Sequence, residues 1–150
     1  MKIRYTIFFC ILLLVPAFLP AQTAAVMEQL LDTQAVSYGQ AALVVLEAAD
    51  LQAGSTPAEA FNYAAERNWL PRKAEGGDQA TLQGVSLLIM QSFGLKGGLF
   101  YSMGKSPHYA YRELVYQEIV QGRADPQMAV SGEYLLFIVG RALDLVEDVQ

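Results

Sequence analysis

The chain has 150 residues, with 10 Lys and Arg against 15 Asp and Glu, one histidine and a single cysteine, Cys10. This length is sufficient for one ordinary hydrophobic core and too short for two full domains. An acidic protein repels phosphate backbones, and no basic helix offsets that charge, so nucleic acid is not an expected partner. The scarcity of histidine and cysteine also argues against a metal site, and no cofactor is expected.

The first 21 residues have the pattern of a secretory signal peptide. Lys2 and Arg4 give a positive start, an apolar run covers residues 5–19, and cleavage is predicted after Ala21, or alternatively after Ala25. The run is short for a membrane span, although an uncleaved N-terminal anchor is the alternative. We therefore expect an exported protein, periplasmic or envelope-associated, that is not integral to the membrane after cleavage. Because the single cysteine lies in this segment, the mature chain would contain no cysteine.

Three segments of the remaining chain align without gaps and indicate an internal repeat. They are residues 36–51, 80–95 and 130–145. Each begins with a small apolar residue and then Ser or Thr, a natural helix N-cap because its oxygen can accept a hydrogen bond from a free backbone N–H. Each has an apolar block in its middle and ends in Asp-Leu or Gly-Leu. Such blocks fit helices buried on most sides, so we predict that the three helices pack against one another in a central hub.

Partner helices are predicted between these segments. Residues 56–59 (Thr-Pro-Ala-Glu) combine an N-cap, a proline at the first helical position and a capping-box glutamate. Ser106-Pro107 begins another helix in the same way, and a short helix over residues 25–31 would be the first partner. Each apolar block alone could equally be a buried strand, but the N-caps and the segment lengths favour helices. We therefore predict an all-α domain over residues 22–150, with about six helices in three helix–loop–helix repeats.

The repeated pattern resembles the second helix of S-layer homology (SLH) repeats. The segment Ile119–Pro126, which leads to Val130-Ser131, is also similar to the loop of that family, in which a glycine and an aspartate precede the next N-cap. The resemblance covers about residues 24–148, in a three-repeat arrangement typical of the family. It implies a pseudo-threefold helical bundle that attaches exported proteins to cell-wall polysaccharide or peptidoglycan.

The resemblance also implies where the ligand would bind, and here the sequence departs from the family. SLH repeat helices begin with a Thr-Arg-Ala-Glu-like stretch whose arginine helps to bind the anionic polymer, and none of the three repeats has that arginine. Arg72 and Lys73 in the second loop and Arg123 in the third are the candidates to replace its charge through charge-assisted hydrogen bonds. The alternative is that these are ordinary solvated surface charges.

The segment over residues 100–112 concentrates tyrosines, an arginine and the only histidine. Tyr109 and Tyr111 could stack on sugar rings, and Arg112 could join them in binding a glycan or a protein partner. Alternatively, these rings pack the link between the second and third repeats. Trp69 is a further candidate platform, although a tryptophan before a proline is more often part of the core.

No catalytic motif is apparent in the sequence. The spacing around Gly104-Lys105-Ser106 does not match a phosphate-binding loop. Ser106 and His108, two residues apart at a helix start, do not face each other. Glu75 and Asp78 lie beside two glycines, where solvated charge is the simpler interpretation.

Two hypotheses for function lead, and an enzyme of cell-wall sugars is a less favoured third. The first is a non-enzymatic, exported SLH-like module that binds a cell-wall glycan. The alternative is a structural or interaction subunit of a periplasmic or envelope protein assembly, with the tyrosine-rich segment as its contact.

Overall fold

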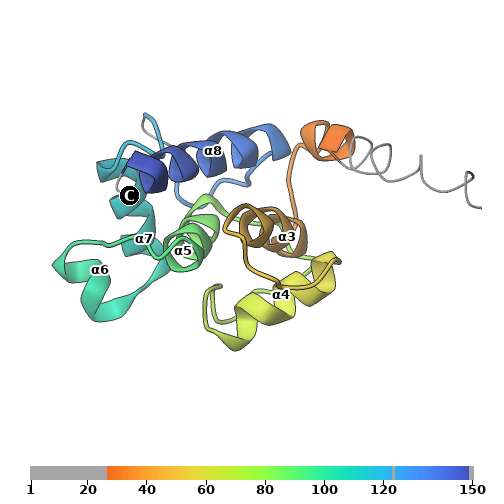
Figure 1. The fold of residues 1–150 in the computed structure, drawn as a ribbon, viewed down its shortest axis with the longest axis horizontal. Coiled ribbons are helices and arrows are strands. Elements are labelled where there is room, and N and C mark those ends of the chain that lie inside the picture. The colour runs from red at the N-terminus through yellow and green to blue at the C-terminus, as the bar shows by residue number, and fades with distance from the viewer. Residues whose placement is uncertain (1–26, 123, 149–150) are drawn as a thin grey trace, which may run out of the picture.

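The computed structural model describes residues 27–122 and 124–148, and within them the protein is all-α, as predicted (Figure 1). The expected signal peptide, the cleavage site and Arg123 lie outside the described residues. Within the described part of the chain, β-pairing is limited to two isolated bridges, between Ser37 and Gln79 and between Thr81 and Ala129. Residues 27–31 are helical, and the helices that follow are α3 (Tyr38–Ala48), α4 (Pro57–Glu66), α5 (Leu82–Ser92), α6 (Leu99–Gly104), α7 (Pro107–Tyr116) and α8 (Gly132–Asp148).

Helix α3 lies in the middle of the molecule and packs against α4, α5 and α8 (Figure 1). Helix α5 packs against α7, and α6 contacts α7 at the edge of the fold. The side chains of Leu46, Leu88 and Ile138, from α3, α5 and α8, are fully buried, while Val44 is half-buried. The hub is therefore centred on α3, because α5 and α8 make little direct contact along their lengths.

The five helix starts that the sequence predicted at a Ser or Thr are each capped by that residue. The hydroxyl oxygen accepts a hydrogen bond from the backbone N–H three residues later, at 3.2 Å for Ser37, 3.3 Å for Thr81 and 3.2 Å for Ser131. Thr56 and Ser106 cap α4 and α7 in the same way, with proline at the first helical position. These local signals fix where the helices begin because they satisfy backbone donors that the helix itself leaves free.

The residues before the three aligned caps are joined by a closed ring of backbone hydrogen bonds. The N–H of Val36 donates to the carbonyl of Val130 at 2.8 Å, and the N–H of Ala80 donates to the carbonyl of Val36 at 2.8 Å. The N–H of Val130 completes the ring by donating to the carbonyl of Ala80 at 3.1 Å. All three residues are fully buried. The starts of α3, α5 and α8 therefore meet at one point in the core.

Four helices end in the same left-handed turn. Asp50, Asn68, Gly94 and Glu118 have φ values of 56°, 58°, 62° and 60°. In each case the N–H of the next residue returns to the carbonyl five residues earlier, at 2.9–3.0 Å. This closure satisfies carbonyls at the helix end, and it explains the Asp-Leu and Gly-Leu endings of the first two aligned segments.

Two features of the structure were not part of the predicted architecture. Helix α8 continues through Asp144-Leu145 to Asp148, past the point at which the first two aligned segments turn. Helix α6 was not predicted, and with it the described residues contain seven helical segments, where about six helices were expected. Six residues flanked by glycines give no helical period that a sequence pattern could reveal.

The N-terminal segment packs on the start of α8. The N–H of Gly132 donates to the carbonyl of Thr33 at 2.9 Å. A Cβ atom at Gly132 would overlap the backbone carbonyl of Leu30. The third aligned segment therefore has a glycine where the first two have a large side chain, because here the backbone of the N-terminal segment occupies that space.

Candidate functional site

The exposed cations predicted to bind a ligand lie beside the C-terminal end of α4. Arg72 and Lys73 are both exposed in the loop that joins α4 to α5. This loop turns tightly, since the N–H of Ala74 donates to the carbonyl of Pro71 at 3.0 Å. Trp69 precedes them and is half-buried, with its ring against the edge of the core. This position is compatible both with a role for Trp69 in the core and with a role in a surface platform.

Two further residues complete this region, Tyr63 and Arg67. The guanidinium carbon of Arg67 lies 3.5 Å from the centroid of the Tyr63 ring and 5.9 Å from that of Trp69. The rings of Tyr63 and Trp69 meet edge to face, with centroids 6.0 Å apart and planes at 71°. Arg67 also donates from Nη1 to the carbonyl of Tyr63 at 3.0 Å. A cation held over an aromatic face is stabilised by the ring's negative quadrupole, so this arginine has a defined position.

Sequence reasoning did not single out Tyr63 and Arg67. Their spacing of four residues on a predicted helix places them on one face, and Arg67 precedes Trp69 by two positions. That spacing was the available signal. We refer to Tyr63, Arg67, Trp69, Arg72 and Lys73 together as the α4-end cluster.

The tyrosines of the second predicted region are largely engaged within the protein. Tyr109 is half-buried and stacks on Phe100, with ring centroids 5.8 Å apart and planes at 17°. Tyr111 donates its hydroxyl proton to the carbonyl of Ala124 at 2.5 Å. Arg112 is exposed on α7. Tyr111 thus helps to hold the loop between α7 and α8, while Tyr109 packs α7 against α6.

The candidate residues belong to two separate regions. Trp69, Arg72 and Lys73 follow α4, which packs on α3, whereas Tyr109, Tyr111 and Arg112 lie on α7, which packs on α5. The fold therefore offers two surfaces and does not join the candidates in one site.

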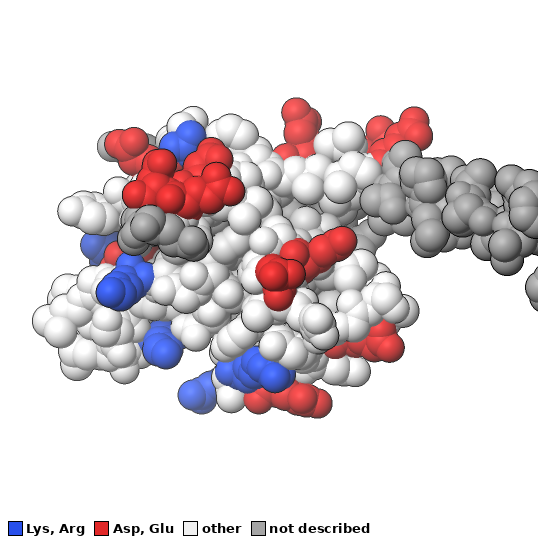
Figure 2. All heavy atoms as spheres, in the orientation of Figure 1, with Lys and Arg blue, Asp and Glu red and all other residues white. Residues whose placement is uncertain are grey.

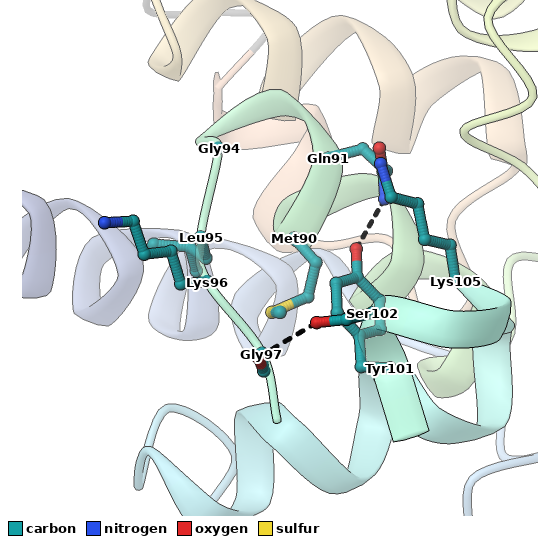
Figure 3. A pocket seen from close by; sticks show the side chains of 9 residues that line it. All are labelled: Met90, Gln91, Gly94, Leu95, Lys96, Gly97, Tyr101, Ser102 and Lys105. Carbon is teal, nitrogen blue, oxygen red and sulfur yellow. Dashed lines mark hydrogen bonds between the residues drawn. The ribbon is translucent and has the colours of Figure 1, made fainter. Parts of the chain in front are cut away.

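A pocket of about 410 Å³ lies between the end of α5 and α6 (Figure 3). At its centre the buried Tyr101 hydroxyl accepts a hydrogen bond from Gln91 Nε2 at 2.5 Å. Burial raises the pKa of Tyr101 above its ordinary value, opposed by the Gln91 hydrogen bond and reinforced by the charge of Glu113. Lys96 and Lys105 line the pocket, but Figure 3 shows their side chains extending from opposite sides without converging. The pocket therefore has no focused positive charge for an anion.

Groups that sequence analysis considered for chemistry have structural roles or stand apart. Ser106 caps α7, accepting from the backbone N–H of Tyr109 at 3.3 Å, and His108 is exposed with its ring against Tyr109. Asp78 accepts from the backbone N–H of Glu75 at 2.9 Å, which closes their loop. Over the described residues, no three His, Cys, Asp or Glu side chains gather closely enough to hold a metal ion.

Charged side chains are unevenly distributed on the surface. Figure 2 shows most Lys and Arg side chains along the margin from α6 to α4, while Asp and Glu gather over α3 and the end of α8 and also lie beside α4. Both candidate surfaces lie along the basic margin of a protein whose net charge is −5. An anionic ligand would meet positive charge along this margin.

Comparisons with models of known protein families, with characterised proteins and with solved structures found no match. Among the described helices, none has the length and apolar character required to cross a bilayer.

Proposed function

We propose that this protein is an exported, non-enzymatic module of the SLH type that binds an anionic cell-wall glycan. The observation that carries the proposal is the ring of hydrogen bonds joining Val36, Ala80 and Val130. These residues occupy the same position in the three aligned segments, and a ring that closes on itself is what a bundle of three related units requires. The ring thus supports the resemblance with a contact that the sequence alignment did not use.

The α4-end cluster is the surface that best fits such a ligand. Arg72 and Lys73 provide exposed charges, which can form charge-assisted hydrogen bonds with carboxylate or phosphate groups of a polymer. Trp69, three residues before Arg72, offers a partly exposed ring for an apolar sugar face. The loop after α4 would then supply the positive charge that SLH repeats carry at their helix starts and that the helix starts of this chain lack.

The test is co-sedimentation of the mature chain with purified cell walls, compared between the natural sequence and Arg72→Ala with Lys73→Ala. We expect the apparent Kd to rise by about tenfold or more, because each hydrogen bond to a charged group contributes roughly 1.5–3 kcal/mol. Added salt should likewise weaken the binding of the natural protein to cell walls.

A matched control removes the same charge from another surface. Lys96→Ala with Lys105→Ala should leave glycan binding nearly unchanged, since both lysines lie beside α6. Equal binding by the Arg72 and Lys73 double variant and the natural protein would exclude the α4-end cluster as the binding surface.

The alternative, an interaction subunit of an envelope protein assembly, is favoured by one observation. Arg112 and Tyr116 of α7 are exposed, and Arg and Tyr are residue types enriched at the energetic centres of protein interfaces. A stable protein partner recovered from an envelope extract, together with no binding to purified cell wall, would support this alternative over glycan binding.

A further inference from the structure

Helix α6 presents an apolar tip to solvent. The exposed fractions are 72% for Leu99, 65% for Phe100 and 78% for Met103. Exposed apolar side chains are common singly, but three on one six-residue helix form a local apolar surface. We call these three residues the α6 tip.

The α6 tip is held firmly by the structure beneath it. Tyr101, on the same helix, is only 4% exposed and is fixed by the hydrogen bond from Gln91. Phe100 rests against the Tyr109 ring, and Gln117 Nε2 donates to the carbonyl of Lys96 at 2.9 Å. The tip is thus presented in a fixed orientation, which reduces the entropy lost on binding.

Positive charges surround the α6 tip. Lys96 precedes α6, Lys105 ends it, and Arg112 is exposed on the adjacent α7. In Figure 2 the uncharged surface over α6 is bordered by Lys and Arg side chains. The carboxylate of Glu113 also lies near this region, beside Gly98. An apolar surface bordered by cations complements a surface that is apolar inside and negatively charged outside.

We propose that the α6 tip is an interfacial binding site for an anionic lipid bilayer. The apolar tip side chains enter the boundary between headgroups and acyl chains, while Lys96, Lys105 and Arg112 contact the negatively charged headgroups. The small area of the tip favours a membrane over a protein. A stable protein interface buries about 800 Å² on each partner, and three side chains of roughly 200 Å² each, here already partly covered, fall well short of that.

This proposal does not depend on glycan binding, because it uses α6 and leaves the α4-end cluster free. The two surfaces can therefore be tested separately in the same protein. Loss of one activity would leave the other unaffected.

The test is sedimentation of the mature chain, residues 22–150, with vesicles of phosphatidylcholine alone or enriched in phosphatidylglycerol. We expect binding only to the phosphatidylglycerol vesicles, weakened by salt. Leu99→Ser, Phe100→Ser and Met103→Ser in one chain should reduce the partition coefficient at least tenfold, because each large apolar side chain contributes that much when buried. Lys96→Gln with Lys105→Gln should reduce binding to phosphatidylglycerol vesicles as well.

Controls separate the α6 tip from general stickiness and from misfolding. Leu31→Ser with Phe137→Ser removes exposed apolar side chains elsewhere and should leave vesicle binding unchanged. The tip variant should keep the circular dichroism spectrum and unfolding midpoint of the natural protein, since its altered side chains are exposed. A Leu99→Trp variant should show a blue shift in emission when phosphatidylglycerol vesicles are added.

Three outcomes would overturn the proposal. They are equal vesicle binding by the tip variant and the natural protein, equal binding to both kinds of vesicle, and no vesicle binding at all. If the natural protein does not bind vesicles but self-associates through the α6 tip, the tip binds a second copy of the chain and the lipid proposal is wrong.

Discussion

The two connections that link α3 to α4 and α5 to α7 begin and end alike, yet differ in length. Each begins at a left-handed residue followed by leucine, at Leu51 and Leu95 respectively. Each ends at a hydroxyl cap followed by proline, at Thr56 and Ser106. The second connection is six residues longer, and the added length forms α6.

The comparison indicates what the architecture requires. The short connection is enough to bring a partner helix back onto the hub. The longer connection therefore adds something beyond the basic turn, and its exposed apolar side chains are a cost to solubility unless they are used. We infer that the hub provides stability while α6 provides a binding surface.

The largest expected effect is at the hub, from Gly132→Ala. The new Cβ atom would overlap the backbone carbonyl of Leu30, and a carbonyl cannot move aside as a flexible side chain can. We expect the free energy of unfolding to fall by about 3 kcal/mol, at the upper end for overpacking a core. Denaturant unfolding measures this change.

Gly140→Ala is the matched control for that change. It lies on the same helix, and a Cβ atom there would meet nothing within 4 Å. Since alanine favours a helix over glycine, we expect a gain of about 0.5–1 kcal/mol. A similar loss of stability in both variants would show that α8 is sensitive to any substitution. The Leu30 carbonyl would then not be the cause of the effect at Gly132.

A smaller effect is expected in the longer connection, from Tyr101→Phe. The variant removes the hydrogen bond from Gln91 Nε2, and we expect to lose about 1 kcal/mol of stability. Amides of α6 should exchange faster with solvent while those of the hub do not change. Loss of protection in the hub as well would contradict the division between the two regions.

Tyr101 also predicts a dependence on alkaline pH. Burial raises the pKa of its hydroxyl in the folded protein above the ordinary value of 10.0. Because the pKa is higher in the folded protein, the contribution of Tyr101 to stability is complete below pH 10.0. It is lost as the pH rises through the folded pKa. This part of the alkaline destabilisation should be absent from Tyr101→Phe.

The smallest effect is expected in the shorter connection, at Glu59. The backbone N–H of Ser55, then the hydroxyl and the backbone N–H of Thr56, lower the pKa of this exposed carboxyl below 4.5. A lowered folded pKa means that its contribution is complete above pH 4.5 and is lost as the pH falls through the folded pKa. Glu59→Gln should therefore flatten a slight acid destabilisation in denaturant unfolding between pH 6 and pH 3, a range that spans the carboxyl titration. If Glu59→Gln had the same stability profile at acid pH as the natural protein, the Glu59 cap would make no contribution to stability.

Local signals allowed much of the fold to be predicted. Ser37, Thr81 and Ser131 cap the helices where the sequence placed them, because a hydroxyl cap depends on neighbours only three residues away. The ring of hydrogen bonds was not predictable, since it joins backbone groups far apart in the chain. Helix α6 was missed because its stability comes from the burial of Tyr101 and not from a helical period.

The candidate site was predictable only in part. Arg72 and Lys73 were identified from their charge, which is a property of the sequence alone. The placement of Arg67 over Tyr63 depends on a contact between side chains on one helix face. The role of Tyr111 was not predictable from local patterns, because its hydroxyl donates to the backbone carbonyl of Ala124 in the following loop.

Hydrogen exchange of the natural protein, with and without phosphatidylglycerol vesicles, tests the central claim most directly. The account predicts that the amides of Val36, Ala80 and Val130 exchange together and slowest, by global unfolding, and that only α6 and its flanking residues gain protection on the vesicles. Three well-separated exchange rates for these amides would contradict the shared hub, and vesicle protection spread over α3 or α8 would contradict the separate role of α6.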